Sequence, residues 1–155
     1  MNKEGGEIMK VSTKGRYGLR ALVDLTVNST DKHVSLVEIA NRQNISLNYL
    51  EQVFGTLRKA GVVKSIKGAQ GGYVLADKPE NIQISTVLTI LEGEFNIVDE
   101  VDPEKRLDSI QLAVKNLVWD KINENVNYYL ENTTLEDLAI EHKRLNHKDS
   151  YMYYI

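Results

Sequence analysis

The short segment from Ala40 to Ser46 constrains the fold more than any other part of the chain. Asn44 follows Ala40 by four residues and suits the left-handed conformation that ends a helix, while Ser46 is a typical helix-capping residue. Ile45, between them, is placed to enter an apolar core. Because Ala40 is small, two helices can approach each other closely across this turn. The pattern predicts a helix-turn-helix.

Three amphipathic helices are predicted around this turn. The first runs from Ser12 to about Asn28, with apolar residues at spacings of three and four and with Ser12 or Thr13 as its cap. The second follows the sequence Ser35-Leu36-Val37-Glu38, a capping box in which the Ser and Glu side chains satisfy exposed backbone amides. The third begins after Ser46 and stops at Gly61.

Two β-rich runs follow the third helix and are separated by a glycine-rich turn. They are Val62-Val63-Lys64-Ser65-Ile66 and Tyr73-Val74-Leu75, on either side of Lys67-Gly68-Ala69-Gln70-Gly71-Gly72. Such runs around glycines are typical of a β-hairpin. Three helices followed by a hairpin is the order of a winged helix-turn-helix, in which the third helix enters the DNA major groove and the hairpin is the wing.

The second half of the chain is predicted to contain a very long helix. A helix from Ser85 to about Glu92 precedes it, and a short one at about 134–142 follows it, after the capping box Thr133-Thr134-Leu135-Glu136. The long helix is expected at about 103–130, with Asp102 as cap and Pro103 at its first position.

This helix is the expected dimerisation element. About 27 residues at about 1.5 Å each give about 40 Å, more than a domain of this size covers alone, so a second copy of the chain is the expected cover. The apolar stripe expected to face that copy consists of Leu107, Ile110, Val114, Leu117, Val118, Ile122, Val126 and Tyr129.

The predicted fold class is therefore mainly α with a small β-hairpin wing, a winged helix-turn-helix plus a long dimerisation helix. Residues 1–8 are expected to be an N-terminal extension, 9–78 the DNA-binding domain and 79–155 the effector and dimerisation region. The charge divides at the same place, because residues 9–78 carry eleven Lys and Arg against five Asp and Glu, whereas 79–155 carry seven against fifteen. The net charge of -3 therefore conceals a basic first half that suits a polyanionic partner.

Several kinds of site are excluded or not predicted. The 155 residues include no cysteine, which excludes disulfides and thiolate metal sites from its side chains. His142 and His147 are five residues apart and do not share a helix face, and His33 is distant in sequence, so no metal site or catalytic constellation is predicted. No apolar run is long enough to span a bilayer, and residues 1–7 lack a signal-peptide core. We expect a cytoplasmic protein that is not an enzyme and has no cofactor and no membrane partner.

Four motifs of the first half occur in a fixed order. They are Ser12-Thr13-Lys14-Gly15-Arg16-Tyr17, then Ile45-Ser46 with Tyr49-Leu50-Glu51-Gln52, then Leu57-Arg58-Lys59-Ala60-Gly61, and finally Gly68 with Gly71-Gly72-Tyr73. These motifs closely resemble the Rrf-two family of bacterial winged-helix transcription regulators, and the likeness runs from Met9 to Ile155. The resemblance implies a homodimer, crossed through the long helix, that binds a partly palindromic operator in double-stranded DNA.

The third helix carries the side chains expected to read bases. Glu51 can accept a hydrogen bond from N4 of cytosine, and Gln52 can pair with N6 and N7 of adenine. Asn48, one turn earlier, can reach a base edge or a phosphate, and the resemblance implies base reading at these three positions. Contacts with phosphates and through the wing, which fix the register without reading sequence, are expected from Ser12, Thr13, Lys14, Arg16, Ser46, Tyr49, Lys67, Gly68, Gly71 and Gly72.

Each of these assignments has a structural alternative. Glu51 and Gln52 could be ordinary exposed helix residues, Lys14 and Arg16 could be solvated charges, and the glycines could serve only the hairpin. The whole winged helix could also be a protein-interaction module without specific DNA binding.

The source of the regulatory signal is a separate question. Some members of the family bind an iron–sulfur cluster through three cysteines before the long helix, and residues 92–107 of this chain have none. The segments Thr133-Thr134-Leu135-Glu136-Asp137-Leu138-Ala139 and Tyr151-Met152-Tyr153-Tyr154-Ile155 look most like the family's repressors of cysteine metabolism. That likeness implies a cofactor-free repressor of cysteine and sulfur genes that binds the enzyme O-acetylserine thiol-lyase. The alternative is a family member that responds to an unrelated metabolite.

Overall fold

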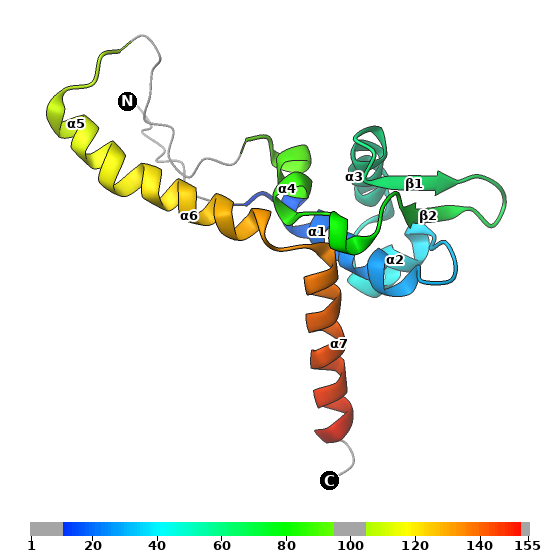
Figure 1. Ribbon diagram of the computed structural model, residues 1–155. Helices are drawn as coiled ribbons and strands as arrows, with labels where there is room; N and C mark the ends of the chain where they lie inside the picture. The colour runs from blue at the N-terminus through cyan, green and yellow to red at the C-terminus, as the bar shows by residue number, and fades with distance from the viewer. Residues whose placement is uncertain (1–10, 95–104, 153–155) are drawn as a thin grey trace, which may run out of the picture.

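The computed structural model describes residues 11–94 and 105–152, which are mostly helical with one two-stranded antiparallel sheet (Figure 1). The elements are α1 (Thr13–Asn28), α2 (Leu36–Gln43), α3 (Leu47–Lys59), β1 (Val63–Ile66), β2 (Gly72–Leu75), the 3-10 turn η1 (Pro79–Asn81), α4 (Ile84–Glu92), α5 (Ser109–Val114), the π turn η2 (Lys115–Trp119), α6 (Asp120–Glu131) and α7 (Leu135–Met152). The predicted fold class is confirmed.

The helix boundaries of the first half follow the capping residues of the sequence. Ser12 caps α1, and Ser35 with Glu38 forms a complete capping box at the start of α2. Asn44 ends α2 in the left-handed conformation, with φ 53°, and Ser46 then caps α3 by accepting from the amide of Tyr49. The predicted helix-turn-helix is therefore confirmed, together with its turn.

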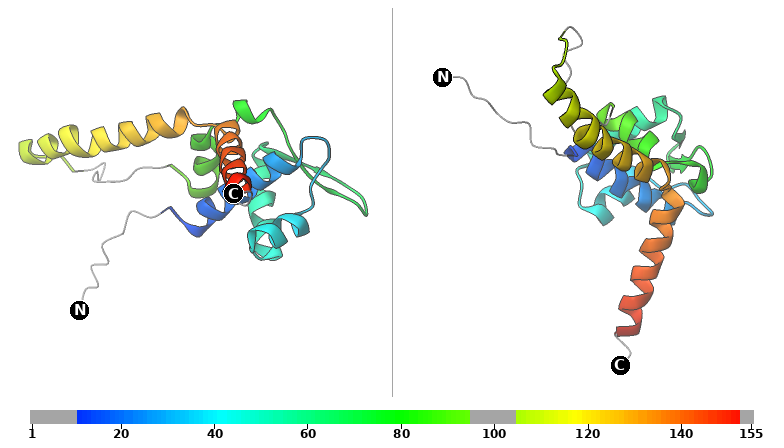
Figure 2. Two further views of the ribbon diagram at one scale, coloured as in Figure 1. Left: turned by 90° about the horizontal axis from the view of Figure 1, so that it is seen from below. Right: turned by 60° about the vertical axis from the view of Figure 1, so that its left-hand side comes forward.

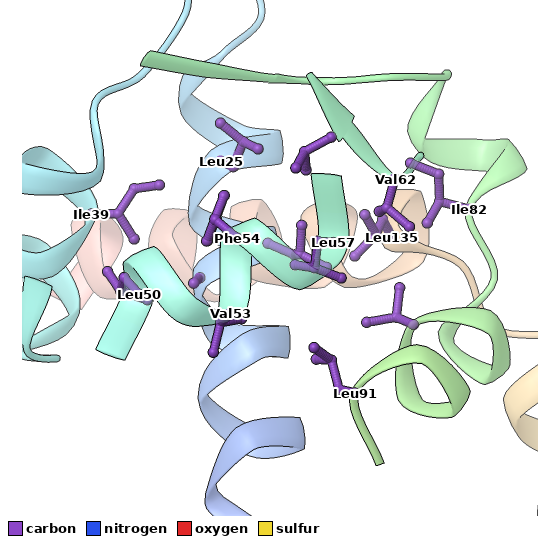
Figure 3. Packing of buried hydrophobic residues seen from close by; sticks show 14 of the residues in the cluster. Leu25, Ile39, Leu50, Val53, Phe54, Leu57, Val62, Ile82, Leu91 and Leu135 are labelled. Carbon is purple, nitrogen blue, oxygen red and sulfur yellow. The ribbon is translucent and has the colours of Figure 1, made fainter. Parts of the chain in front are cut away.

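One apolar core joins the helices of this winged unit (Figure 3). Leu25 of α1, Ile39 of α2, and Leu50 and Phe54 of α3 are all fully buried. Burial of each such side chain contributes about 1.5–3 kcal/mol of transfer free energy. Leu135, the first residue of α7, is also fully buried in this cluster, so the start of α7 packs in the core of the winged unit.

The wing is held to the body of the unit by a short strand-like contact. Val34, between α1 and α2, exchanges two backbone hydrogen bonds with Tyr73 of β2, at 3.0 and 2.8 Å. The ring of Tyr73 lies edge-on to Phe54 of α3, with centroids 5.0 Å apart. A Cβ on Gly72 would lie 2.6 Å from the carbonyl oxygen of Val34, so this glycine is required by packing inside the protein.

An ion pair between a buried carboxylate and a partly exposed guanidinium joins α1 to the end of α2. The Asp24 side chain is only 2% exposed and accepts from Nε of Arg42 at 3.0 Å and from Nη2 at 2.7 Å. Nε2 of Gln43 donates to the same carboxylate at 2.9 Å. Hydrogen bonding to Asp24 raises the pKa of Arg42 above its ordinary value.

Residues 109–131 project from the winged unit as an arm. α5, η2 and α6 form one continuous helix that extends away from the unit on the side opposite the wing (Figures 1 and 2). No helix among the described residues combines the length and apolar character needed to cross a membrane.

The predicted start of the long helix at about residue 103 is wrong. The helix begins at Ser109, because Asp108 and Gln111 form a capping box in which each side chain accepts from the other residue's amide, at 2.8 and 3.0 Å. Residues 106–108 are not helical, so Leu107 precedes the helix and does not belong to its stripe. Asp102 and Pro103, the predicted cap and first helical residue, lie outside the described residues.

The predicted last helix also differs from the structure. It continues to Met152, ten residues beyond the predicted end at about 142. Its capping box pairs Thr134 with Asp137, whose carboxylate accepts from the Thr134 amide at 2.9 Å, rather than Thr133 with Glu136. The Thr133 carbonyl instead accepts from the Ile84 amide at 2.8 Å, which docks this turn against the start of α4.

We expect Arg42→Met to destabilise the protein by about 2 kcal/mol, because a buried carboxylate would lose its charged partner. Urea unfolding followed by circular dichroism measures this change. Arg144→Met is the matched control, since Arg144 pairs with Glu141 where both side chains are about half exposed. That control should change stability by no more than about 0.5 kcal/mol. Equal losses of unfolding free energy in the two variants would contradict the stabilising role of the Asp24–Arg42 pair.

We expect Gly72→Ala to cost about 2 kcal/mol, because the new Cβ would press on backbone atoms that cannot move aside without breaking the Val34–Tyr73 contact. Gly55→Ala is the control, since nothing lies within 4 Å of a Cβ at that position in α3. It should stabilise the protein by about 0.5–1 kcal/mol, because alanine favours a helix interior. Both are measured by the same unfolding experiment, and an unchanged Gly72→Ala protein would show that the contact can relax.

Candidate nucleic-acid interface

The exposed face of α3 brings together the three predicted base-reading residues. Asn48, Glu51 and Gln52 are exposed and share one helix face at spacings of three and four. Leu50 and Phe54 occupy the opposite, buried face and fix the orientation of the helix. The face offers a carboxylate acceptor and two amides that both donate and accept, which is the chemistry of a base-edge contact.

The first turn of α3 is fixed by its cap and by an aromatic contact. Ser46 accepts from the Tyr49 amide at 3.1 Å, and the Tyr49 ring lies edge-on to Tyr17 of α1, with centroids 5.9 Å apart. Burial and the neighbouring Tyr17 raise the pKa of Tyr49, so its phenol remains a neutral donor at physiological pH. The contact places the beginning of α3 beside α1.

The N-terminal end of α1 holds Ser12, Thr13, Lys14 and Arg16, and the structure adds a residue that the sequence did not indicate. Glu92, the last residue of α4, accepts at Oε1 from the Ser12 hydroxyl, from the Ser12 amide at 2.8 Å and from the Gly15 amide at 3.1 Å. The Ser12 hydroxyl proton is thus used inside the protein. Thr13 and Arg16 are exposed and Lys14 is half-buried, so these three remain the groups of this helix end that can meet a phosphate.

Arg20 adds a further cation beside this surface. Its guanidinium carbon lies 5.2 Å from the centroid of the Tyr17 ring, and its Nη2 donates to the carbonyl of Gln43 at 2.5 Å. The guanidinium therefore spans α1 and the end of α2, one residue before the Asn44 turn.

The wing turn contains Lys67, Gly68, Gly71 and Gly72. Lys67 and Gly68 are exposed, whereas Gly71 and Gly72 are half-buried. Gly68 has φ 123°, a conformation that L side chains rarely adopt, and its carbonyl accepts from the Gly71 amide at 3.0 Å. His33 donates from Nε2 to the carbonyl of Gln70, which ties the turn to the loop before α2. No local sequence pattern indicates this contact, because His33 is distant from the wing along the chain.

The predicted dimerisation residues lie on the arm. Ile110, Leu117 and Tyr129 are 75%, 75% and 68% exposed in the single chain. Val114, Val118 and Ile122 are also exposed, and Val126 is half-buried. The arm thus carries a long exposed apolar surface, which is unusual for a soluble monomer.

No described group of three or more His, Asp or Glu residues within 11–94 and 105–152 is placed to hold a metal ion. A groove between α1 and α7 is lined by Leu19, Val23, Leu138 and His142, among others. His147 is exposed elsewhere on α7, so the two C-terminal histidines do not converge on one site.

Comparison with known proteins finds transcriptional regulators that are similar to this chain over most of its length. The HTH-type transcriptional regulator CymR of Bacillus subtilis is 40% identical over 147 residues, which cover 95% of this chain and 100% of that protein. The HTH-type transcriptional regulator IscR of Cereibacter sphaeroides is 39% identical over 134 residues, covering 84% of this chain and 86% of that protein. The solved structure of the B. subtilis protein, described as CymR (YrzC), the global cysteine regulator, superposes with a TM-score of 0.75 over 86% of this chain and 98% of that one.

The family described as "Rrf2: Iron-dependent Transcriptional regulator" matches residues 11–141, which contain the winged unit, the arm and the first turns of α7. This chain belongs to the Rrf2 family of transcriptional regulators.

Proposed function

We propose that this regulator represses genes of cysteine and sulfur metabolism by binding a partly palindromic operator as a homodimer, without a cofactor. The observation that carries the DNA contact is the exposed face of α3, where Asn48, Glu51 and Gln52 lie together on a capped and well-packed helix. The cations of α1 and the wing flank this face, and the arm supplies the dimer interface.

The residues of the DNA contact divide into two groups by chemistry. Glu51, Gln52 and Asn48 read base edges in the major groove. Thr13, Lys14, Arg16, Ser46 and Tyr49 hold phosphates, while Lys67 and the glycines beside it bring the wing to the duplex. Ser12 acts through the cap of α1, because its hydroxyl donates to Glu92.

The proposal of a homodimer rests on the exposed stripe of the arm. Residues 109–131 form a helix of about 34 Å at about 1.5 Å per residue. Apolar side chains exposed along this length cost free energy in water, and a second arm of the same kind buries them.

The proposal of cysteine control rests on the relatives. The B. subtilis protein that is 40% identical over its whole length is described, in its solved structure, as a global cysteine regulator. We propose that the same genes are controlled here and that O-acetylserine thiol-lyase is the partner that carries the signal. The segment Tyr151-Met152-Tyr153-Tyr154-Ile155 is the candidate docking peptide, with packing back on the dimer as the alternative.

Iron, which the family description names, has no place in this proposal. The chain has no cysteine, and the described residues offer no cluster of other ligands. The residues present therefore do not fit an iron site.

Duplex affinity should fall steeply as salt concentration rises. The slope of log K against log salt should be about -0.9 for each phosphate neutralised, because binding releases condensed counterions. Fluorescence anisotropy with a labelled operator duplex between low and physiological salt measures this slope. Binding that does not depend on salt, or no duplex binding at all, would favour the alternative of a protein-interaction module.

Gln52→Ala should relax base preference at one operator position at a cost of about 1–3 kcal/mol, because it removes a bidentate contact with one base. Lys14→Ala should weaken binding to all sequences alike and lower the salt slope by about 1, because it removes a phosphate contact. Anisotropy with a panel of singly substituted duplexes distinguishes the two patterns. If both variants lose affinity uniformly, the assignment of the recognition residues is wrong.

Purified O-acetylserine thiol-lyase should raise the affinity of the regulator for its operator, and added O-acetylserine should reverse the gain. Removal of residues 151–155 should abolish this effect while leaving the affinity of the regulator alone unchanged.

Genome-wide mapping of bound sites, with and without cysteine, tests the target genes directly. Sites distant from sulfur genes would leave the DNA-binding function intact and contradict the cysteine assignment.

A further inference from the structure

The π turn η2 interrupts the arm helix near its middle. The Asp120 amide donates to the carbonyl of Lys115, five residues earlier, and so closes a wider turn than an α-helix has. The Lys115 and Asp120 side chains bridge the same turn, with Nζ 2.9 and 2.7 Å from the two carboxylate oxygens. In an unbroken α-helix, residues i and i+5 are about 140° apart around the axis and do not face each other. The ion pair therefore depends on the wider turn.

The wider turn changes which faces of α5 and α6 are aligned. At about 100° per residue, an unbroken helix would place Ile122 about 120° and Val126 about 160° around the axis from Ile110. One extra residue in a turn rotates everything after it back by about 100°. Ile122, Val126 and Tyr129 are thereby brought to the same side of the arm as Ile110 and Val114.

The polar residues of α6 show which face would lie in line with Ile110 if the arm had no π turn. Lys121 and Glu124 form an ion pair of 2.9 Å in which both side chains are about 60% exposed, so this flank of the helix is solvated. On the other flank, Leu130 packs against the core of the winged unit. Without the π turn, Ile110 would lie in line with Lys121 instead of Ile122, and the apolar stripe would be split between two faces.

We propose that η2 is a register device that aligns the apolar residues of α5 and α6 into one continuous seam for a second copy of this chain. The proposal rests on the homodimer proposed above. The arm extends beyond the winged unit, and no element among the described residues covers the exposed side chains of α5 (Figures 1 and 2). A stripe on a projecting helix suits a partner with the same stripe, because a two-fold axis places identical faces together.

Insertion of one alanine after Asn116 tests the proposal, because it rotates the residues after the turn by about 100° relative to Ile110 and Val114. Deletion of Asn116 is the matched control. It removes the extra residue, restores an unbroken α-helix and leaves Ile122 about 20° around the axis from Ile110, as in the wild type.

Sedimentation equilibrium should show the dimer dissociation constant of the insertion variant raised by at least about 100-fold, because half of the seam no longer meets the partner. The deletion variant should match the wild type. An insertion variant that dimerises like the wild type, or a deletion variant that does not dimerise, overturns the proposal and leaves the homodimer intact, whereas a monomeric wild type overturns both.

A second measurement uses the chain at its natural length and does not depend on folding of the insertion variant. Because the chain has no cysteine, single cysteines can be introduced one at a time for maleimide labelling. Ile110→Cys, Val114→Cys and Ile122→Cys should all label slowly at dimer-forming concentrations and rapidly on dilution, whereas Glu124→Cys should label rapidly throughout. Rapid labelling at residues 110 and 114 while residue 122 is protected would show two separate faces and overturn the proposal.

Discussion

The ion pair of Asp24 and Arg42 is the interaction on which the placement of α3 depends. It joins the middle of α1 to the last turn of α2, immediately before the Asn44 turn that sets the direction of α3. Apolar packing alone would hold these helices together but would tolerate sliding. A bidentate guanidinium–carboxylate contact has one preferred geometry, so it fixes where α2 ends. The position of the exposed residues of α3 follows from that point.

The wing and the end of α1 are fixed by contacts that cross long distances in sequence. Val34 pairs with Tyr73, and Glu92 accepts three hydrogen bonds from Ser12 and Gly15. These contacts use backbone groups that would otherwise be unsatisfied at a helix end and at a strand edge. The backbone groups at the start of α1 and at the edge of the wing are therefore already hydrogen-bonded. The exposed side chains of these elements remain available for a ligand.

Local signals predicted the helix-turn-helix and the hairpin, because caps and turns depend on a few neighbouring residues. Ser35 with Glu38, Asn44 and Ser46 each act within four positions, and each marks its boundary correctly. The predicted start of the long helix is too early because the sequence contains two capping patterns, one at residue 102 and one at residue 108. Asp102-Pro103 resembles a start, but the Asp108–Gln111 box supplies two hydrogen bonds at the observed one. The π turn had no local signal, and Glu92 and His33 act on residues too distant in sequence for any pattern to show.

α1 contacts helices from both halves of the chain. Glu92, from the end of α4, holds its first turn, α7 packs along it, and Asp24 connects it to α2 and so to the turn before α3. A ligand changes DNA affinity only if it binds two arrangements of such an element with different affinity. α1 therefore lies between α7 and the helix-turn-helix, while α4 contacts both α3 and the arm helix α6. The opposite charges of the two halves fit this division, since only the half ordered around α1 has to attract a polyanion.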